Sequence, residues 1–475
     1  MSGENFPPSS AVQIQAPVEP EAQSTTATVA CFVIVVLGYL VGFAFPDWAP
    51  AVLIALPALC LLARQRSEWR ALGLGLMAGF VICAVLLNFM WTIFGAYAVG
   101  LWLVGALPFG VFLLLLNRAR VRVGPLWSIL LTPILWTGLE YFRSEVWPLK
   151  FAWLLPGQAA ALLPGVQLCV IGVYGLGFVY MLLAALSVGE LKWQRLTGAA
   201  GLAVAAILMY ALPWPTVPSN VPVHVAGVQT ERWEVADIAK ALDSLATEHP
   251  EAQILVLSEC AFSDAVPTEV REEITKHQRY LVAGGWAPDG NGGNYNTAFV
   301  VGPDGKDIFS QAKSMPVQFL DDGTPAAVRE VWESPWGKIG IAICYDACYA
   351  SVMDDFVRQG ARGLIIPTMD LTDWGEFERR TLHGRIQPVR SAEYGIPTFG
   401  VWSSGVSQLT DRAGKVIATA GYPGQGETLA GSFDLSRAGR VPPDRYLAWA
   451  SLIATGLFVG FLLVPQRGKS TSQVS

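Results

Sequence analysis

Ile341-Ala342-Ile343-Cys344-Tyr345-Asp346 is an apolar, strand-like run that ends in a cysteine and a carboxylate. Two other reactive side chains follow the same pattern: Glu259 ends the run Ile254-Leu255-Val256-Leu257-Ser258-Glu259, and Lys313 lies near the end of a further expected strand. A thiol can attack a carbonyl carbon when a carboxylate takes its proton and a cation stabilises the oxyanion. The pattern therefore predicts Cys344 as nucleophile, Glu259 as general base and Lys313 as oxyanion partner.

Each of these three residues, taken alone, also fits a structural role as a buried cysteine, an exposed glutamate or a surface lysine. A free thiol has a pKa of about 8.5, so Cys344 needs a neighbouring base or cation to become nucleophilic. The shared strand-end context of the three residues favours the catalytic interpretation. The backbone N–H of Tyr345 is expected to be a second donor to the oxyanion.

The composition indicates a membrane protein. Hydrophobic residues make up 52% of the 475 residues and charged residues only 15%, whereas soluble proteins carry about 25% charged residues. The deficit is concentrated in apolar segments, and a bilayer-spanning helix needs about 20 apolar residues. We predict eight membrane-spanning helices, at residues 27–46, 48–64, 71–93, 97–117, 124–142, 165–189, 197–214 and 445–464.

Basic residues in the short loops predict the orientation of these helices. Cytoplasmic loops carry an excess of Lys and Arg, and all the basic clusters fall on one side when the eight spans are taken in order. This argues against the alternative in which some spans are buried core helices. It predicts cytoplasmic termini, with residues 215–444 outside the cytoplasm. The clusters are Arg64, Arg66 and Arg70; Arg118, Arg120 and Arg122; Lys192 and Arg195; and Arg467 and Lys469.

The remaining composition excludes several other functions. Residues 1–26 are rich in Pro, Ser, Glu and Gln, which predicts a disordered tail and not a cleavable signal, which begins with basic residues. The net charge of −6 and the lack of a basic patch argue against a nucleic-acid partner. We expect no metal and no cofactor, because the cysteines outside the spans lack metal-ligand spacing. Cys344 and Cys348 could form a disulfide in an oxidising compartment, but a strand end that points Cys344 into a cleft favours the free thiol.

Residues 221–437 return to a soluble composition in which strand-like and helix-like segments alternate. Such alternation predicts a layered α/β domain. The predicted organisation is a tail at 1–26, a seven-helix membrane domain at 27–214, a catalytic domain at 215–440, an eighth helix at 445–464 and a cytoplasmic tail at 465–475. The expected strands are 221–229, 253–259, 280–286, 297–301, 338–344, 363–367 and 398–402; the expected helices are 234–247, 267–277, 347–360 and 376–393.

Further motifs lie in both the membrane and the α/β segments. They are Trp136-Thr137-Gly138-Leu139-Glu140-Tyr141-Phe142-Arg143, Val170-Ile171-Gly172-Val173-Tyr174-Gly175-Leu176-Gly177-Phe178, Val228-Gln229 with Trp233, Arg390-Ser391-Ala392-Glu393 and Ser403-Ser404-Gly405. With these motifs, residues 27–464 resemble the bacterial apolipoprotein N-acyltransferases, membrane-embedded relatives of the nitrilases, or carbon–nitrogen hydrolases. The resemblance implies an αββα sandwich inserted between spans seven and eight, in the bacterial inner membrane with the catalytic domain on the periplasmic side.

The resemblance also implies a two-step reaction. Cys344 would attack an acyl ester of a membrane phospholipid, form a thioester and release a lysophospholipid. The α-amino group of the N-terminal diacylglyceryl-cysteine of an apolipoprotein would then take the acyl chain. The catalytic triad of the family would correspond to Glu259, Lys313 and Cys344. The partners would be the bilayer, the donor phospholipid and the acceptor lipoprotein.

Two carboxylates depart from the family pattern. Phe319-Leu320-Asp321 stands where the family has Phe-Gly-Glu, and Cys344-Tyr345-Asp346 stands where it has Cys-Tyr-Glu. Each change shortens the side chain by one methylene while keeping its charge, which alters positioning. We expect Asp321 and Asp346 to support the site by holding Lys313 and its loop. The alternative for Asp346 is a solvated side chain at a strand end.

Four residues are candidates for substrate binding: Trp233, Trp374, Glu140 and Arg143. Glu140 and Arg143 lie three residues apart on one expected helix, where they would pair with each other or contact a lipid headgroup. Tryptophans at the membrane surface would line or guard a lateral opening, or would only anchor helices; Trp147 and Trp153 fit both descriptions. We expect His383 to be structural or exposed, because the mechanism needs no second base.

Two other functions compete with acyl transfer to lipoproteins. A membrane-tethered nitrilase-type amidase would use the same triad with water as the second nucleophile, but a small soluble substrate does not require a membrane domain. A non-catalytic lipid- or lipoprotein-binding relative would explain the two shortened carboxylates, but Glu259, Lys313 and Cys344 are all retained.

Overall fold

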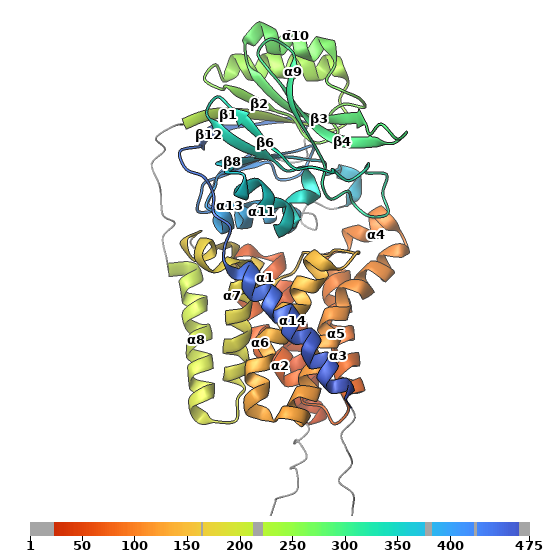
Figure 1. The fold of residues 1–475 in the computed structure, drawn as a ribbon, viewed down its shortest axis with the longest axis vertical. Helices are drawn as coiled ribbons and strands as arrows, with labels where there is room; N and C mark the ends of the chain where they lie inside the picture. Colours follow the sequence, from red (N-terminus) through yellow and green to blue (C-terminus); the bar gives the residue numbers. More distant parts are fainter. Residues whose placement is uncertain (1–22, 163–164, 212–221, 376–381, 422–424, 465–475) are drawn as a thin grey trace, which may run out of the picture.

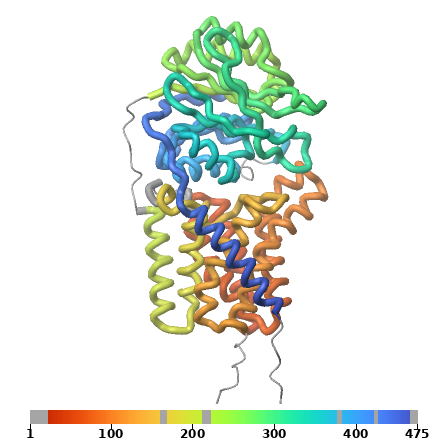
Figure 2. Tube along the Cα trace, viewed as in Figure 1, coloured from red at the N-terminus to blue at the C-terminus, as the bar shows by residue number. Residues whose placement is uncertain are grey.

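The protein has two bodies, a bundle of apolar helices and an α/β sandwich that lies on one end of it (Figure 1). The computed structural model describes residues 23–162, 165–211, 222–375, 382–421 and 425–464. The tail expected at 1–26 and the one expected at 465–475 lie largely or wholly outside these residues. The chain runs through the bundle first, then through the sandwich, and returns to the bundle for its last helix (Figure 2).

The bundle places helices at all eight positions predicted from hydropathy. Five of the described helices are long and apolar enough to cross a membrane: α1, α3, α5, residues Leu168–Ser187 of α7, and α14. α14 crosses the front of the bundle diagonally (Figure 1). The bounds are α1 Thr25–Ala44, α2 Ala51–Leu62, α3 Glu68–Leu86, α5 Tyr97–Val123, α6 Pro125–Tyr141, α7 Gly165–Ser187, α8 Lys192–Ala211 and α14 Asp444–Leu463.

The predicted span 71–93 is two helices instead of one. α3 ends at Leu86, and a short helix α4 (Phe89–Phe94) follows it. Gly95 ends α4 with φ +56°, a conformation that glycine adopts without steric cost. α4 projects beside the lower layer of the sandwich (Figure 1). The hydropathy pattern missed this break because residues 71–94 are uninterrupted by charge.

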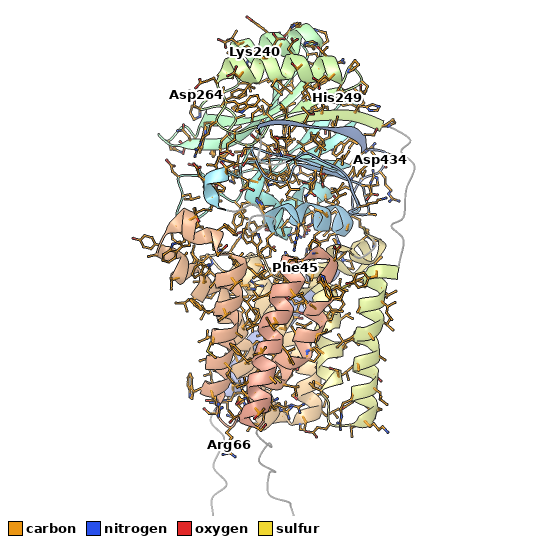
Figure 3. The ribbon with its side chains drawn as sticks, turned by 180° about the vertical axis from the view of Figure 1, so that it is seen from behind. Phe45, Arg66, Lys240, His249, Asp264 and Asp434 are labelled. Carbon is orange, nitrogen blue, oxygen red and sulfur yellow. The ribbon has the colours of Figure 1, made fainter. Side chains whose placement is uncertain are left out.

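Basic residues lie at the end of the bundle that is remote from the sandwich. Arg66 marks this end in Figure 3, whereas Phe45 marks the junction of the two bodies. The chain reaches the remote end between α2 and α3, between α5 and α6, and between α7 and α8, and these are the loops that carry the predicted basic clusters.

The sandwich consists of two six-stranded sheets. One has the strand order β12-β1-β2-β3-β4-β5 and the other β11-β10-β9-β8-β7-β6. In each sheet the three central strands are parallel and the outer ones antiparallel. The bounds are β1 Pro222–Thr230, β2 Ile254–Val256, β3 Tyr280–Pro288, β4 Asn294–Val301, β5 Asp307–Ala312, β6 Val331–Ser334, β7 Gly337–Ile341, β8 Gly363–Thr368, β9 Thr398–Trp402, β10 Gln408–Thr410, β11 Val416–Thr419 and β12 Gln425–Asp434.

Helices cover the outer faces of both sheets, which gives the αββα arrangement. α9 (Val235–Glu248) and α10 (Thr268–His277) cover the first sheet on the side away from the bundle; α11 (Ala350–Arg358) and α13 (Ile386–Tyr394) lie between the second sheet and the bundle (Figure 1). Apolar side chains of both inner faces, among them Val225, Ile341 and Phe399, form one buried cluster. The expected helix 376–393 begins outside the described residues.

A buried ion network joins the bundle to the sandwich. Arg445, at the start of α14, bonds to Asp354 of α11 at 3.2 Å and to Glu393 of α13 at 2.9 Å. Glu393 also pairs with Arg390, which donates to the carbonyl oxygens of Ala347 (2.8 Å) and Cys348. These carbonyls belong to the turn that follows Cys344. Breaking a buried charge pair costs several kcal/mol. The network therefore fixes the turn after Cys344, at the end of β7, over the helices of the bundle.

Candidate active site

Three strand ends meet at one cavity between the two bodies. Glu259 follows β2, Lys313 follows β5 and Cys344 follows β7. The cavity that these side chains line has a volume of about 180 Å³. The structure therefore brings together the three residues that were predicted as nucleophile, base and cation.

Lys313 is buried between two carboxylates. Its Nζ lies 2.7 Å from Glu259 Oε1 and 2.6 Å from Asp322 Oδ2. Asn296 of β4 links the same two carboxylates, since its Nδ2 donates to Glu259 Oε1 at 2.7 Å and to Asp322 Oδ1 at 2.9 Å. Burial alone would lower the pKa of Lys313, but Glu259, Cys344 and Asp322 raise it well above its usual value. The lysine is thus a permanent cation.

The carboxylate beside Lys313 is that of Asp322, whereas the resemblance to the family motif predicts Asp321. Asp321 is exposed, and Asp322 is 8% exposed and also accepts from the Val317 N–H at 2.6 Å. The expectation that Asp321 holds Lys313 is therefore wrong by one residue. Either aspartate of the pair Asp321-Asp322 could have paired with Lys313, and the path of the loop backbone places Asp322 there. Asn296, a fully buried polar residue of β4, was the missed signal for a second partner.

This difference gives a matched pair of variants. We expect Asp322→Asn to lower turnover by about tenfold or more, because Lys313 loses one of its two anionic partners and shifts its Nζ. We expect Asp321→Asn to retain the wild-type turnover. Steady-state acyl-transfer rates of the two purified variants test this, and equal losses in both would contradict the assignment.

Cys344 has a strained backbone and a protonated thiol. Its φ is +51°, in the left-handed region that a non-glycine residue rarely adopts, as at other functional turns. The residue begins the 3₁₀ turn Cys344–Cys348 and is 7% exposed. Burial, followed by the charge of Glu259, raises the pKa of the thiol well above its usual value. Cys344 Sγ lies 4.0 Å from the carbonyl oxygen of Met369, and Glu259 lines the same cavity as the thiol. Glu259 can therefore receive the thiol proton when Cys344 attacks.

The second oxygen of Glu259 and the carboxylate of Asp346 are held by backbone donors. Glu259 Oε2 accepts from Met369 N at 2.7 Å. Asp346 is fully buried and accepts from the N–H groups of Ser314 (3.0 Å), Met315 (2.7 Å) and Ile343 (3.2 Å). Asp346 thus joins the loop after Lys313 to the strand end before Cys344. The alternative, in which Asp346 is a solvated side chain at a strand end, is therefore wrong.

Asp346 gives a second prediction. Burial raises the pKa of its carboxyl to about 6, partly offset by the backbone donors. Asparagine carries no charge, and its side chain has one acceptor oxygen in place of two for the three N–H groups that Asp346 holds. We therefore expect Asp346→Asn to lower turnover about tenfold, a barrier change of about 1.4 kcal/mol. Labelling of the Cys344 thiol should remain at the wild-type rate. A wild-type turnover would contradict the role.

The same pKa has a consequence for stability. Because the folded-state pKa is above the ordinary value, the folded protein binds more protons than the unfolded chain between about pH 4 and 6. The contribution of Asp346 to stability is therefore largest at low pH and is lost as the pH rises through about 6. Asp346→Asn should flatten this part of the pH–stability profile, as measured by thermal unfolding.

The bundle supplies the apolar wall of the cavity. Phe89, Met90, Ile93 and Phe94 of α4, and Leu101 and Val104 of α5, line it opposite the polar residues.

Aromatic residues also border the cavity. Trp374 and Trp153 line it, as does His383. Trp153 is buried, donates from Nε1 to Cys348 Sγ at 2.9 Å and packs against Tyr345 with ring centroids 6.0 Å apart. Burial lowers the pKa of His383 to about 4, so this side chain is neutral. In the structure Cys344 and Cys348 are free thiols.

Other predicted binding residues lie elsewhere. Trp233 borders a shallow depression beside α9, where it packs near Gly426. Glu140 and Arg143 are buried inside the bundle and form no ion pair with each other within the described part of the chain. The guanidinium of Arg143 instead lies 5.4 Å from the ring centroid of Phe151. Trp147 packs on Phe142 outside the cavity. Trp233, Glu140 and Arg143 do not line the Cys344 cavity, and their part in substrate binding stays a prediction.

Comparisons with known proteins assign both bodies. Residues 37–186 match the family model of the apolipoprotein N-acyltransferase N-terminal domain, and residues 221–443 match that of the carbon–nitrogen hydrolases. The chain belongs to the apolipoprotein N-acyltransferase family. Both matched domains line the cavity of this chain: the helical domain through α4 and α5, and the hydrolase domain through Glu259, Lys313 and Cys344.

Curated relatives match either about four-fifths of the chain or about one third of it. The apolipoprotein N-acyltransferase of Geobacter metallireducens is 25% identical, over 80% of this chain and 85% of that protein. The apolipoprotein N-acyltransferase of Gloeobacter violaceus is 24% identical, over 81% of this chain and 84% of that protein. The omega-amidase NIT2 of Danio rerio is 25% identical, over 36% of this chain and 73% of that protein. The relatives that cover both bodies are thus the acyltransferases.

Proposed function

We propose that this protein transfers an acyl chain from a membrane phospholipid to the α-amino group of the N-terminal diacylglyceryl-cysteine of apolipoproteins. One observation carries the proposal: the cavity around Cys344 combines buried reactive groups from the sandwich with an apolar wall from α4 and α5. A lipid ester can present its carbonyl to the thiol while its chain contacts that wall.

In the first step Glu259 takes the proton from the Cys344 thiol as sulfur bonds to the ester carbonyl carbon. The carbonyl oxygen becomes an oxyanion beside Lys313 Nζ, with the backbone N–H of Tyr345 as second donor. The intermediate collapses by breaking the carbon–oxygen ester bond. Glu259 returns its proton to the departing oxygen, so a lysophospholipid leaves and a thioester remains on Cys344.

In the second step a neutral amine attacks the thioester carbonyl. Glu259 takes a proton from the attacking nitrogen, and Lys313 again stabilises the oxyanion. The carbon–sulfur bond breaks, an amide forms, and Cys344 recovers its proton from Glu259. One carboxylate serves both steps, so the site needs no second base, in keeping with the neutral His383.

The competing amidase would complete the second step with water. The apolar wall formed by α4 and α5 favours a lipid substrate, because a small amide gains nothing from it. The test supplies the purified protein with phospholipid and either a diacylglyceryl-cysteine peptide or a set of small amides. We expect N-acylated peptide and stoichiometric lysophospholipid; amide hydrolysis without peptide acylation would establish the amidase instead.

We propose that the protein lies in the bacterial inner membrane, with the sandwich on the extracytoplasmic side. The basic loops at the remote end of the bundle support this orientation. A reporter enzyme that is active only outside the cytoplasm should be active when fused at residue 230. A cytoplasmic reporter active at the same position would contradict the orientation.

A further inference from the structure

A second cavity lies at the junction of the two bodies, and the proposed reaction does not use it. Its volume is about 720 Å³, four times that of the Cys344 cavity. The end of α1 and the turn after it form one side, around Phe43 and Phe45. The other side consists of α13, the loop before β10 and the β10–β11 hairpin, around Ile386 and Val406. We call this cavity the junction groove. Figure 3 places Phe45 at this level, where the bundle meets the sandwich.

The junction groove has an apolar interior and a cationic rim. Its two charged lining residues are Arg385 and Lys415. Within the described parts of the chain, no carboxylate lies within 4.0 Å of either cation. Arg385 is half-buried, and its guanidinium donates to the carbonyl oxygens of Phe43 and Ala44 (2.8 Å), which leaves other N–H groups of the fork for a ligand.

The charge on Arg385 persists despite its burial. Burial lowers the pKa of the guanidinium to about 10, and it remains a cation at neutral pH. The α1 carbonyls supply partial negative charge at a helix end, but they supply no full counter-charge. Lys415 is exposed at the mouth of the groove. Two cations above an apolar cavity at the junction of the two bodies therefore match an anion with an attached apolar part.

We propose that the junction groove is a second lipid site, which binds a glycerophospholipid of the outer leaflet. Its phosphate lies between Arg385 and Lys415, and one acyl chain lies along Phe43, Ile386 and Val406. An arginine fork matches two phosphate oxygens, and basic pockets beside membrane helices bind lipid headgroups. The positive rim disfavours the acceptor, whose reacting group is an amine.

The second lipid site also contacts the first. Trp153 lines both the junction groove and the Cys344 cavity. Trp153 therefore contacts a lipid in the groove and also borders the substrate. The binding claim itself does not depend on the proposed reaction, since it rests on the groove residues alone.

Photocrosslinking of the full-length protein tests the proposal. The probes are a phosphatidylglycerol with a photoreactive acyl chain and a diacylglycerol with the same chain but no phosphate. Peptide mass spectrometry then locates the adducts. We expect phosphatidylglycerol adducts on the groove segments 42–46, 382–389 and 406–416, about tenfold above those of diacylglycerol. Adducts on α4 report the Cys344 cavity separately, so failure of one site is distinguishable from failure of the other.

Variants decide what the phosphate contacts. Arg385→Gln and Lys415→Gln should each reduce groove adducts about fivefold or more and leave α4 adducts unchanged, whereas Arg385→Lys should retain most of them. Lys240→Gln, on the far side of the sandwich, is the matched control. If Arg385→Gln fails to fold, Lys415→Gln and Arg385→Lys carry the test. Equal adducts from diacylglycerol, undiminished adducts in Lys415→Gln, or displacement by millimolar inorganic phosphate would overturn the lipid assignment.

Discussion

Cys344→Ala should abolish formation of the acyl-amide product while the protein remains folded and inserted in the membrane. The thiol is the nucleophile of the first proposed step and carries the acyl chain into the second, and the cavity holds no second thiol among its described lining residues. Removing the nucleophile of such a site costs many orders of magnitude in turnover, of the order of 10⁶ in well-studied hydrolases. The measurement is N-acylation of a diacylglyceryl-cysteine peptide in detergent micelles, followed by mass spectrometry.

Cys348→Ser is the matched control for this variant. Cys348 lies in the same 3₁₀ turn, but its sulfur accepts from Trp153 Nε1 and does not line the cavity. A serine hydroxyl retains an acceptor for that bond, so turnover should stay close to the wild-type value. Substantial acylation by Cys344→Ala, or a complete loss in Cys348→Ser with normal labelling of Cys344, would refute the nucleophile assignment.

Glu259→Gln should lower turnover by about 10² to 10⁴, the usual contribution of a positioned general base. The amide keeps oxygen and nitrogen at the carboxylate positions but cannot take the thiol proton. It also leaves Lys313 with Asp322 as its remaining anion at 2.6 Å, so the fold should persist. Both the release of lysophospholipid and the acylation of the peptide should slow, because one base serves both steps.

The two half-reactions can be measured separately in this variant. Lysophospholipid release in the absence of peptide reports the first step, and transfer from acylated enzyme to peptide reports the second. Alkylation of Cys344 by a small reagent checks that the thiol remains accessible. A loss confined to the second step would remove Glu259 from the attack of the thiol and assign it to the amine alone.

The sequence was sufficient to predict those parts of the site in which an apolar strand ends in a reactive side chain. Glu259 and Cys344 follow buried parallel strands, which the pattern marks clearly. The sequence pattern did not predict β6, β10, β11 or β12, and it indicated β5 only as a strand that ends near Lys313. β11 is a short, largely exposed edge strand, and edge strands carry weaker apolar patterns.

The sequence pattern could not predict which distant parts of the chain contact each other. Arg445 and Asp354 are 91 residues apart, and nothing in either segment alone indicates their pairing. Asp322 was missed because an adjacent aspartate fitted the family motif equally well, and only the path of the loop distinguishes them. The buried placement of Glu140 depends on how α6 packs against its neighbours, which periodicity does not determine.

The most direct test of the proposed mechanism is the intact mass of the purified protein after incubation with a phospholipid of defined acyl chains and no acceptor. We predict a single adduct equal to that acyl chain, localised to Cys344 by peptide mapping, released by hydroxylamine and transferred to a diacylglyceryl-cysteine peptide when the peptide is added. An unmodified Cys344 under conditions in which the peptide is acylated would contradict the thioester mechanism.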